Sequence, residues 1–368
     1  MSGRRFARGA IIVATLALAL GLSGAGSATK GASAFKVAVI LVGPHNDGGW
    51  SQAHYDGMQY VQKALGSKVQ TTYKENIAPG AQMDQTIQSL QNQGYQMIFA
   101  TSYGMVTKAV AAKYPKIKFE QATGTDVSSN LAEYFGSAED TVFLSGMAAG
   151  AASKSGNIGY VVAFPIPEVI RHANAFALGA QLTHPGAKVH LVWTNSWYDP
   201  AKEKKAAQSL VSQGADVLGQ NVDSPATGQY AESKGLGWVG YDSDASTFAP
   251  KSWLTASVYN WGPYMLQRIK AAMAGTWKPG FYYGSMNDGF TKLAPFGPLV
   301  SAKTRKLILA REKAIENGTF YEFEGPLYNQ AGKLMVPAGK RLKVIPDLYS
   351  MQWLVKGVIG NISRVPPP

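Results

Sequence analysis

Cysteine is absent from the 368 residues of this chain. Its absence excludes disulfide bonds, thiolate nucleophiles, cysteine-ligated metals and the acylated cysteine of a lipoprotein anchor. Histidine is also scarce, and the five histidines show no metal-binding spacing such as His-Glu-x-x-His. Neither a Gly-x-Ser-x-Gly nucleophile loop nor a Walker A phosphate loop occurs. We therefore expect neither catalysis nor a bound metal or other cofactor.

Long apolar runs are absent after residue 34. No stretch in this later part approaches the ~18 apolar residues of a membrane span. Near the N-terminus, Arg4, Arg5 and Arg8 precede the apolar run Ala10–Leu22, and an A-x-A cleavage motif follows at residues 32–34. This arrangement predicts a signal peptide over residues 1–34 and a soluble, exported mature protein without a lipid anchor. The Arg4-Arg5 pair leaves twin-arginine export open, although ordinary secretion is favoured.

The formal net charge of the full chain is +12. Residues 1–34 hold four basic residues and no acidic ones, so their removal leaves a net charge of +8. A basic protein can bind nucleic acid, but here the lysines are dispersed along the chain instead of forming clusters. We therefore interpret the excess charge as a solvated basic surface and expect no nucleic-acid partner.

Short apolar runs alternate with helical patterns from Phe35 onward, and the alternation starts again near residues 154–156. Alternating strands and helices predict parallel sheets covered on both faces, so the fold class is α/β with two such units in tandem. Local signals mark some boundaries, and Asp199-Pro200 predicts a helix N-cap followed by proline at the first helical position. After residue 277 the pattern becomes irregular and the tail is rich in loops.

The segment Val37–Gly57 combines the features of a ligand-binding loop. An apolar run predicts a buried strand, a polar Gly-rich loop follows Gly43-Pro44, and a helical pattern begins near Trp50. In a doubly wound sheet, such loops lie at the carboxyl edge of the strands, where ligands bind. An ordinary strand-to-helix loop capped by Asn46 or Asp47 is the alternative.

Polar and aromatic residues follow the ends of most predicted strands. They are Asn46, Asp47, Trp50, Tyr103 and Thr123 in the first series, Phe164, Trp197, Asp223 and Asp242 in the second, and Asn260 after the next strand. Singly, each could be a core aromatic residue or a loop cap. Together they should line facing edges of two sheets, where aromatic planes stack on a flat ring and polar groups bind its rim.

Several segments resemble the basic membrane protein family, also called the purine nucleoside receptor A family. The similar segments are Val37–Gly57, Phe143–Ala149, Gly156–Ala180, the Trp197–Asp199 loop and Gly240–Asp244. The resemblance covers residues 36–263 well and the remainder loosely. It implies a substrate-binding protein of a bacterial ABC importer with the type I periplasmic binding fold, in which two lobes each contain a doubly wound parallel sheet.

The resemblance also implies how the chain is shared between the lobes. Lobe I is expected to contain residues 35–155 plus 256–284, and lobe II residues 156–255 plus 285–368. The chain would then cross between the lobes near Ser155, Ala256 and Tyr283. Such crossings serve as hinges, so we expect the lobes to close on a ligand.

Residue by residue, the family pattern implies roles for five positions. Trp50 and Trp197 match the aromatic faces that sandwich a base. Asn46 and Asp47 match the pair that hydrogen-bonds the base, and Asp242 matches the carboxylate that holds ribose hydroxyls. Because both tryptophans are predicted in loops, we expect their loss to cost less stability than the loss of a core tryptophan.

The chain departs from the family pattern around the ribose. The family often has aspartate where residues 121–124 lie here, and lysine where Asn260 lies. Residues 223–227, Asp-Ser-Pro-Ala-Thr, replace a glycine-rich segment. These departures favour a free purine base or a related small heterocycle.

We therefore interpret the chain as an extracytoplasmic receptor. It would close on a purine base or nucleoside and present it to the membrane permease of an ABC transporter, without chemistry. A sugar receptor of the same fold is the main alternative, because tryptophan also stacks on pyranose faces. A secreted hydrolase acting on nucleosides, with Asp223 and Asp242 as its acid–base pair, is a remote one.

Overall fold

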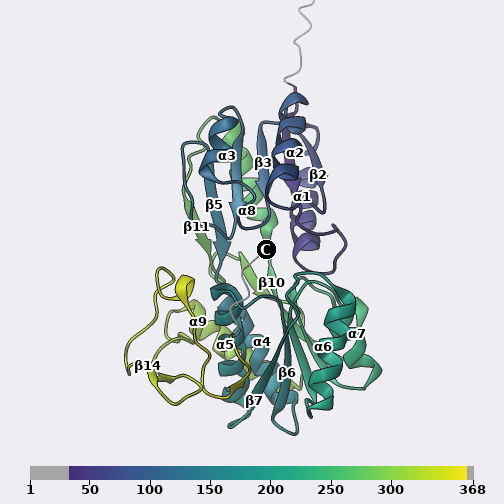
Figure 1. The fold of residues 1–368 in the computed structure, drawn as a ribbon, viewed down its shortest axis with the longest axis vertical. Coiled ribbons are helices and arrows are strands. Elements are labelled where there is room, and N and C mark those ends of the chain that lie inside the picture. Colours follow the sequence, from purple (N-terminus) through teal and green to yellow (C-terminus); the bar gives the residue numbers. More distant parts are fainter. Residues whose placement is uncertain (1–32, 363–368) are drawn as a thin grey trace, which may run out of the picture. The chain divides into compact units, whose positions relative to one another are not determined.

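A computed structural model describes residues 33–362 of the chain (Figure 1). The predicted signal peptide, with its cleavage motif, lies almost entirely outside the described residues and stays a prediction. Within residues 33–362, no helix combines the length and hydropathy needed to cross a membrane. The described part contains two main sheets and a small two-stranded one, which agrees with the predicted α/β class.

The first sheet has six strands in the order β11-β5-β4-β3-β1-β2, and every neighbouring pair is parallel. Its strands are β1 (Phe35–Ile40), β2 (Val69–Lys74), β3 (Met97–Ala100), β4 (Lys118–Ala122), β5 (Leu131–Gly136) and β11 (Phe281–Gly284). Most of β1 and all of β3 and β5 are buried, as expected of strands covered on both faces. We call the unit around this sheet the first lobe.

The second sheet has seven strands in the order β12-β10-β9-β8-β6-β7-β15. Its strands are β6 (Asn157–Val162), β7 (Lys188–Trp193), β8 (Val217–Asn221), β9 (Gly237–Asp242), β10 (Trp253–Tyr259), β12 (Thr291–Leu293) and β15 (Val358–Ile359). All neighbouring pairs are parallel except β10 with β12. We call the unit around this sheet the second lobe. The small sheet pairs β13 (Leu327–Tyr328) with β14 (Leu334–Val336).

Helices cover both sheets (Figure 1). They are α1 (Trp50–Leu65), α2 (Ala81–Asn92), α3 (Lys108–Lys113), α4 (Ala138–Ala152), α5 (Pro167–Thr183), α6 (Pro200–Ser212), α7 (Ala226–Ser233), α8 (Trp261–Met273) and α9 (Ala302–Glu316). Helix α1 packs on α8, α4 packs on α5, and α6 packs on α7. Three short 3₁₀ helices complete the described elements: η1 (Gly66–Lys68), η2 (Ser246–Phe248) and η3 (Leu348–Ser350).

Helix α4 is buried around nearly its whole circumference, because its small residues let α5 approach closely. A Cβ atom on Gly146 would lie 2.2 Å from the carbonyl oxygen of Phe176, and one on Gly179 would lie 1.9 Å from that of Phe143. Such distances leave room only for glycine. The Ala- and Gly-rich sequence of this segment is therefore a packing requirement.

The chain passes between the lobes at three places, two of which differ from the expected positions. Helix α4 packs against β9 and β10, so the first crossing lies at Ser137 and not at Ser155. Strand β10 stays in the second sheet through Tyr259, so the second crossing lies at Asn260 and not at Ala256. The third crossing, expected at Tyr283, follows the end of β11 at Gly284. Helix α4 thus belongs to the second lobe, because its apolar surface is covered there.

Candidate functional site

The two lobes touch where the loop before α1 meets loops that follow β8 and β9. The hydroxyl of Ser243 donates a hydrogen bond to the carbonyl oxygen of Gly48. Gly49 lies so close to Asp223 that a Cβ atom on it would be 2.6 Å from the carbonyl oxygen of Asp223. The carboxyl edges of the two sheets therefore meet at this point, and several predicted site residues lie beside it.

Asp47 organises the first-lobe side of this contact. Its carboxylate accepts hydrogen bonds from the backbone N–H groups of Gly49, Ser51 and Gln52, at 2.8, 2.9 and 2.9 Å. Burial raises the pKa of Asp47, and these hydrogen bonds oppose the rise. The side chain thus acts as an anionic cap on the start of α1, where the helix leaves N–H groups without internal partners.

Trp50 is a core residue as well as a site candidate. Its side chain is 8% exposed, and its indole N–H donates a 2.6 Å hydrogen bond to the carbonyl oxygen of Thr101. Its ring lies edge-on to Tyr259 and Trp261, with centroid distances of 5.4 and 5.2 Å. The expectation that Trp50 lies in a loop is therefore wrong, because the residue begins α1 and the first turn carries its ring into the interior.

The second-lobe side contains a linked set of loops. Trp197, after β7, lies edge-on to Phe164, after β6, with a centroid distance of 5.2 Å. The backbone N–H of Asp223 donates a 2.9 Å hydrogen bond to the carbonyl oxygen of Trp197. Three loops that the sequence placed at strand ends are thus held together at one edge of the sheet.

Asp223 and Asp242 form a buried carboxyl pair. Their side chains lie within hydrogen-bonding reach of one another, and the residues are 4% and 1% exposed. Burial raises the pKa of both, and neighbouring negative charge adds to the effect, mainly from Asp47 on Asp223 and from Glu168 on Asp242. Asp242 has a positive φ of 67°, and its Oδ1 atom lacks a hydrogen-bond partner. An unpartnered, buried carboxyl oxygen is suited to a ligand donor.

The other four predicted site residues make none of the contacts between the lobes described above. Asn46 is exposed, and Tyr103 is 70% exposed. Thr123 is partly exposed, with a φ of 71°. The side-chain amide of Asn260 donates a 3.0 Å hydrogen bond to the carbonyl oxygen of Gly289, so this residue secures the loop before β12.

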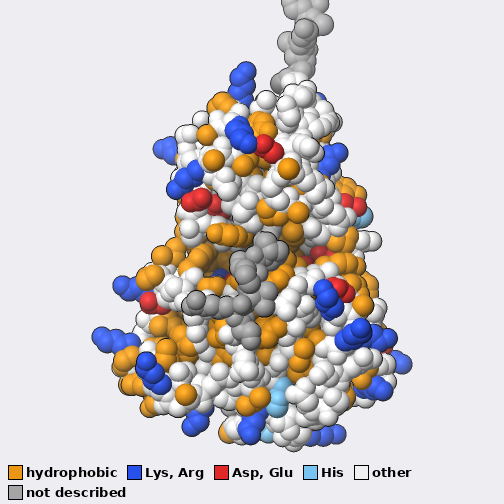
Figure 2. Space-filling model, in the orientation of Figure 1, with side chains coloured by type: hydrophobic (Ala, Val, Ile, Leu, Met, Phe, Trp, Pro, Cys, Tyr) orange, Lys and Arg blue, Asp and Glu red, His pale blue; other side chains and the backbone are white. Residues whose placement is uncertain are grey.

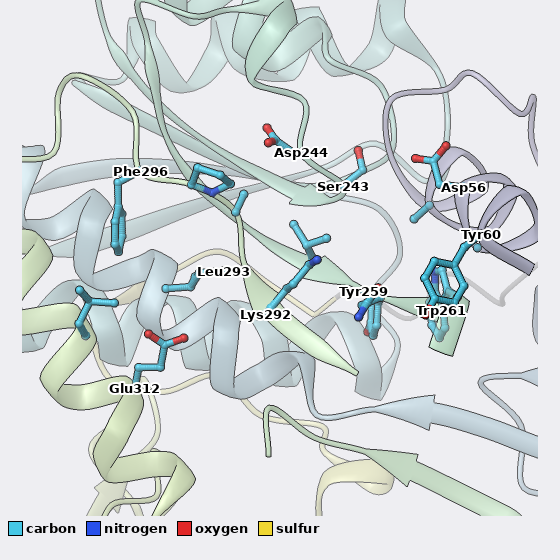
Figure 3. Close-up of a pocket in the computed structure, with 18 residues that line it drawn as sticks. Asp56, Tyr60, Ser243, Asp244, Tyr259, Trp261, Lys292, Leu293, Phe296 and Glu312 are labelled. Atoms are coloured by element: carbon cyan, nitrogen blue, oxygen red, sulfur yellow. The ribbon is translucent and has the colours of Figure 1, made fainter. Parts of the chain in front are cut away.

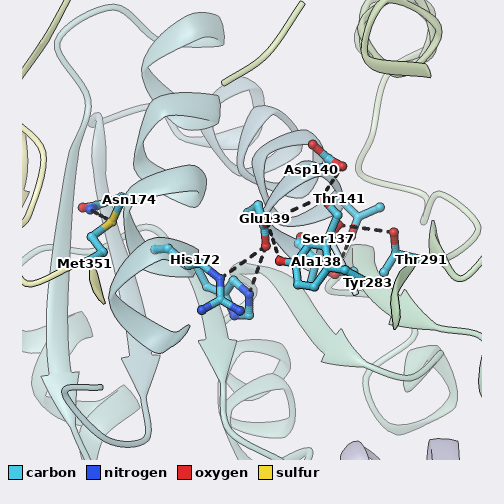
Figure 4. A network of polar contacts seen from close by, with 12 residues as sticks. Ser137, Ala138, Glu139, Asp140, Thr141, His172, Asn174, Tyr283, Thr291 and Met351 are labelled. Atoms are coloured by element: carbon cyan, nitrogen blue, oxygen red, sulfur yellow. Dashed lines mark hydrogen bonds and ion pairs between the residues drawn. The ribbon is translucent and has the colours of Figure 1, made fainter. Parts of the chain in front are cut away.

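The structure adds a charged cluster that the sequence interpretation missed (Figure 4). Arg171 Nε lies 3.4 Å from Glu139 Oε2, and the hydroxyl of Tyr283 donates a 2.7 Å hydrogen bond to Glu139 Oε1. Although burial opposes it, the adjacent His172 ring, with Nε2 3.8 Å from Oε2, and the charge of Arg171 lower the pKa of Glu139 to about 2. Burial lowers the pKa of His172 to about 4. The available signal was an adjacent Arg-His pair inside a largely apolar helix.

The charged cluster continues toward the carboxyl pair. Glu168, in the first turn of α5, interacts electrostatically with both Arg171 and Asp242. Burial and the charge of Glu139 raise the pKa of Glu168 to about 7, whereas the charge of Arg171 opposes the rise. Among the residues that the structure describes, no group of three or more histidine or acidic side chains is arranged to hold a metal ion.

A hollow of about 710 Å³ lies beside the second crossing, and residues of both lobes line it, including Ser243 (Figure 3). Its walls come from α1, the β10–α8 junction, β12 and α9, and they include Asp56, Tyr60, Lys292 and Glu312. Of the ten predicted site residues, it contains Asn260 alone. On the face shown in Figure 2, lysine and arginine side chains are scattered and form no continuous patch.

Two lobes, three crossings and facing carboxyl edges define a type I periplasmic-binding-protein fold. A solute-binding protein from Conexibacter woesei DSM 14684, described as part of an ABC transporter system, has this fold. Its structure superposes with a TM-score of 0.66 at 21% identity, covering 78% of this chain and 98% of that one.

Residues 34–320 match the family of PnrA-like ABC transporter substrate-binding proteins, and the chain belongs to this family. Its members bind a transported substrate and are not enzymes.

Curated relatives support the family assignment over most of the chain. A purine-binding protein of Brucella abortus (strain 2308) is 38% identical over 341 residues, which cover 92% of this chain and 97% of the relative. A protein of Haloferax volcanii, named provisionally as an ABC transporter glucose-binding protein, is 32% identical. That match covers 76% of this chain and 71% of the relative.

Proposed function

We propose that this protein is the extracytoplasmic receptor of an ABC importer and binds a purine base or nucleoside between its lobes. The observation that carries the proposal is the meeting of the two sheet edges, where the loop of Asp47 and Trp50 touches the loops of Asp223 and Ser243. Aromatic rings and buried carboxyl groups are thus brought to one edge. The similarity to a purine-binding relative supports this ligand class.

In the proposed mechanism, the ligand enters between open lobes and is enclosed when they meet. Trp50 from the first lobe and Trp197 from the second supply flat apolar surface for the ring. We expect Asn46, Asp47 and Asp223 to form hydrogen bonds with its edge. Closure is driven by the ligand's higher affinity for the closed form, and the closed receptor then docks on a membrane permease.

Thermal unfolding in the presence of candidate ligands tests the ligand class. A purine present at about 100 times its dissociation constant should add roughly 2.7 kcal/mol to the free energy of unfolding. We expect purine bases or nucleosides to raise the melting temperature and hexoses and pentoses to leave it unchanged. A screen in which only sugars stabilise the protein would overturn the proposal.

A sugar receptor is the second candidate, because the Haloferax volcanii relative is named for glucose. The two candidates differ in the role of Asp242. For a free base, Asp242→Asn should change affinity little, whereas for a nucleoside or a sugar it removes an acceptor for ring hydroxyls. Calorimetric titration of Asp242→Asn with a base, its nucleoside and glucose separates these cases.

Export by the segment at residues 1–34 is part of the proposal. N-terminal sequencing of the protein from its native host should find a mature start near Phe35. A protein recovered from the cytoplasm with Met1 intact would contradict the extracytoplasmic assignment.

A further inference from the structure

The C-terminal segment, residues 321–362, lies beyond the stretch matched by the family model and is fastened to the second lobe. Strand β15 extends the second sheet beside β7. The side-chain amide of Asn174, on α5, donates a 2.8 Å hydrogen bond to the carbonyl oxygen of Trp353 and accepts one of 2.8 Å from the backbone N–H of Val355. These contacts hold the preceding 3₁₀ helix, η3, against α5.

This attachment places Tyr349 over the guanidinium of Arg171. The guanidinium carbon lies 5.2 Å from the centroid of the Tyr349 ring and 5.4 Å from that of Phe135. Phe135 belongs to β5 of the first lobe, so the guanidinium lies between an aromatic ring of each lobe. Tyr349 also lies edge-on to Tyr283 of β11, with a centroid distance of 6.1 Å. The C-terminal segment therefore takes part in the contact between the lobes.

Two polar atoms in this enclosure have no hydrogen-bond partner. They are Nη2 of Arg171, whose side chain is 2% exposed, and the buried hydroxyl of Tyr349. Arg171 Nε is already committed to Glu139. Leaving a buried donor unpaired destabilises a fold, so such atoms require an explanation. Phe135, against which the guanidinium lies, is itself 6.2 Å from Trp50 between ring centroids, so the enclosure adjoins the aromatic side of the candidate site.

We propose that Arg171 and Tyr349 form a subsite for a carbonyl oxygen of the ligand, so that the receptor prefers oxopurines to aminopurines. This inference rests on the proposed purine-binding function. Arg171 Nη2 can only donate, and the hydroxyl of Tyr349 can donate. An exocyclic carbonyl oxygen can accept from both groups, whereas an exocyclic amino group at the same position cannot accept and leaves Arg171 Nη2 unpaired. Sites with buried hydrogen-bonding groups strongly reject analogues that cannot pair with them.

Titration calorimetry with hypoxanthine and adenine tests the subsite, because these bases carry an oxygen and an amino group at the same ring position. The unmodified protein should bind hypoxanthine about tenfold more tightly, or better. Tyr349→Phe keeps the ring over Arg171 and removes only the hydroxyl. It should weaken hypoxanthine binding roughly 2- to 10-fold and adenine binding less.

Two further variants complete the experiment. Arg171→Lys keeps the positive charge but loses Nη2, so it should also reduce the preference for hypoxanthine. Tyr328→Phe is the matched control, because Tyr328 lies in the same C-terminal segment and is 44% exposed. It should leave both affinities unchanged.

The outcomes separate this inference from the proposed function. If both bases bind the unmodified protein equally well, the oxygen subsite is wrong and purine binding stands. The subsite is also wrong if Tyr349→Phe weakens the binding of both bases alike, because the hydroxyl then acts through packing. It is equally wrong if the variant weakens the binding of neither base, because the enclosure then holds only water. If no purine binds, the proposed function fails and the oxopurine preference fails with it.

Discussion

The two walls that meet between the lobes differ in how completely their polar groups are satisfied. On the first-lobe wall, Asp47 accepts three backbone hydrogen bonds, and the Trp50 N–H is bonded to Thr101. On the second-lobe wall, Asp242 Oδ1 and Arg171 Nη2 are buried without partners. The loop of Asp47 and Trp50 is thus held by its own chain, although the neighbouring Trp261 Nε1 is also buried without a partner, whereas the second wall retains hydrogen-bonding capacity near its carboxyl pair.

The difference has a thermodynamic consequence. Satisfied groups on the first wall stabilise the fold, so their replacement should mainly reduce stability. Unpaired groups and crowded carboxyls on the second wall weaken the fold, so their replacement should change ligand affinity and pH dependence more than stability. The following predictions test this contrast, from the largest expected effect to the smallest.

Trp50→Ala should destabilise the protein by about 3–5 kcal/mol, as for other buried tryptophans. The side chain fills space among Phe135, Tyr259 and Trp261, and its N–H bond to Thr101 is lost as well. Trp197→Ala, on the second wall, removes a partly exposed ring and should cost less. Urea unfolding of both variants measures the difference. Equal losses would remove the contrast between the walls.

Gly49→Ala should weaken ligand binding without unfolding either lobe. The added Cβ would lie 2.6 Å from the carbonyl oxygen of Asp223, so the lobes could not meet as they do here. Overpacking of this kind costs about 1–3 kcal/mol, or roughly 5- to 150-fold in affinity. Gly280→Ala is the control, because a Cβ there meets nothing within 4 Å. Solution scattering at saturating ligand should show a larger radius of gyration for Gly49→Ala; unchanged closure would contradict the prediction.

Asp223→Asn should stabilise the protein relative to the parent as pH rises. The folded-state pKa of Asp223 is raised, so its ionisation is disfavoured in the fold. The stability that the protonated acid confers is complete below the unfolded pKa near 4 and is lost as pH rises toward the folded pKa. The amide keeps its shape without ionising, so its advantage over the parent should grow from pH 4 toward neutral pH. Denaturant titrations from pH 4 to 8 measure it, and a constant difference would refute the assignment.

Ser243→Ala should reduce affinity modestly, because it removes the hydrogen bond from Ser243 to the carbonyl oxygen of Gly48 across the lobes. A net contribution of about 0.5–1.5 kcal/mol corresponds to roughly 2- to 13-fold in affinity. Without ligand, Ser243→Ala should lose less free energy of unfolding than Trp50→Ala does. Calorimetry that finds unchanged affinity would mean that this bond does not contribute to closure.

Tyr103→Ala should have the smallest effect. The side chain is 70% exposed, so its removal should change the free energy of unfolding by less than about 0.5 kcal/mol. If the residue joins the site only on ligand binding, the variant would instead lose affinity at unchanged stability. Titration with the ligand that emerges from the thermal screen distinguishes the two results.

Much of this protein was decided by local sequence. Alternating apolar runs and helical patterns predicted both parallel sheets, because strands buried on two faces need continuous apolar residues. Asp199 caps α6 as its sequence predicted, since its side chain bonds the backbone N–H of Lys202 and Pro200 follows at the first helical position. The family was also evident from short segments, because the strand–loop–helix motif around Asp47 and Trp50 is compact in sequence.

Tertiary structure alone decided which lobe each crossing element joins and which strand-end residues lie at the contact between the lobes. The apolar residues of helix α4 favour no single face, so its pattern could not indicate that it packs on β9 and β10. Trp50 lies in the core and Asn260 is bonded to Gly289 because of neighbours distant in sequence. Arg171 lies between Phe135 and Tyr349, two residues far apart along the chain, and periodicity cannot reveal such an enclosure. Residue type and spacing set the local elements, whereas side-chain environments depended on how those elements pack.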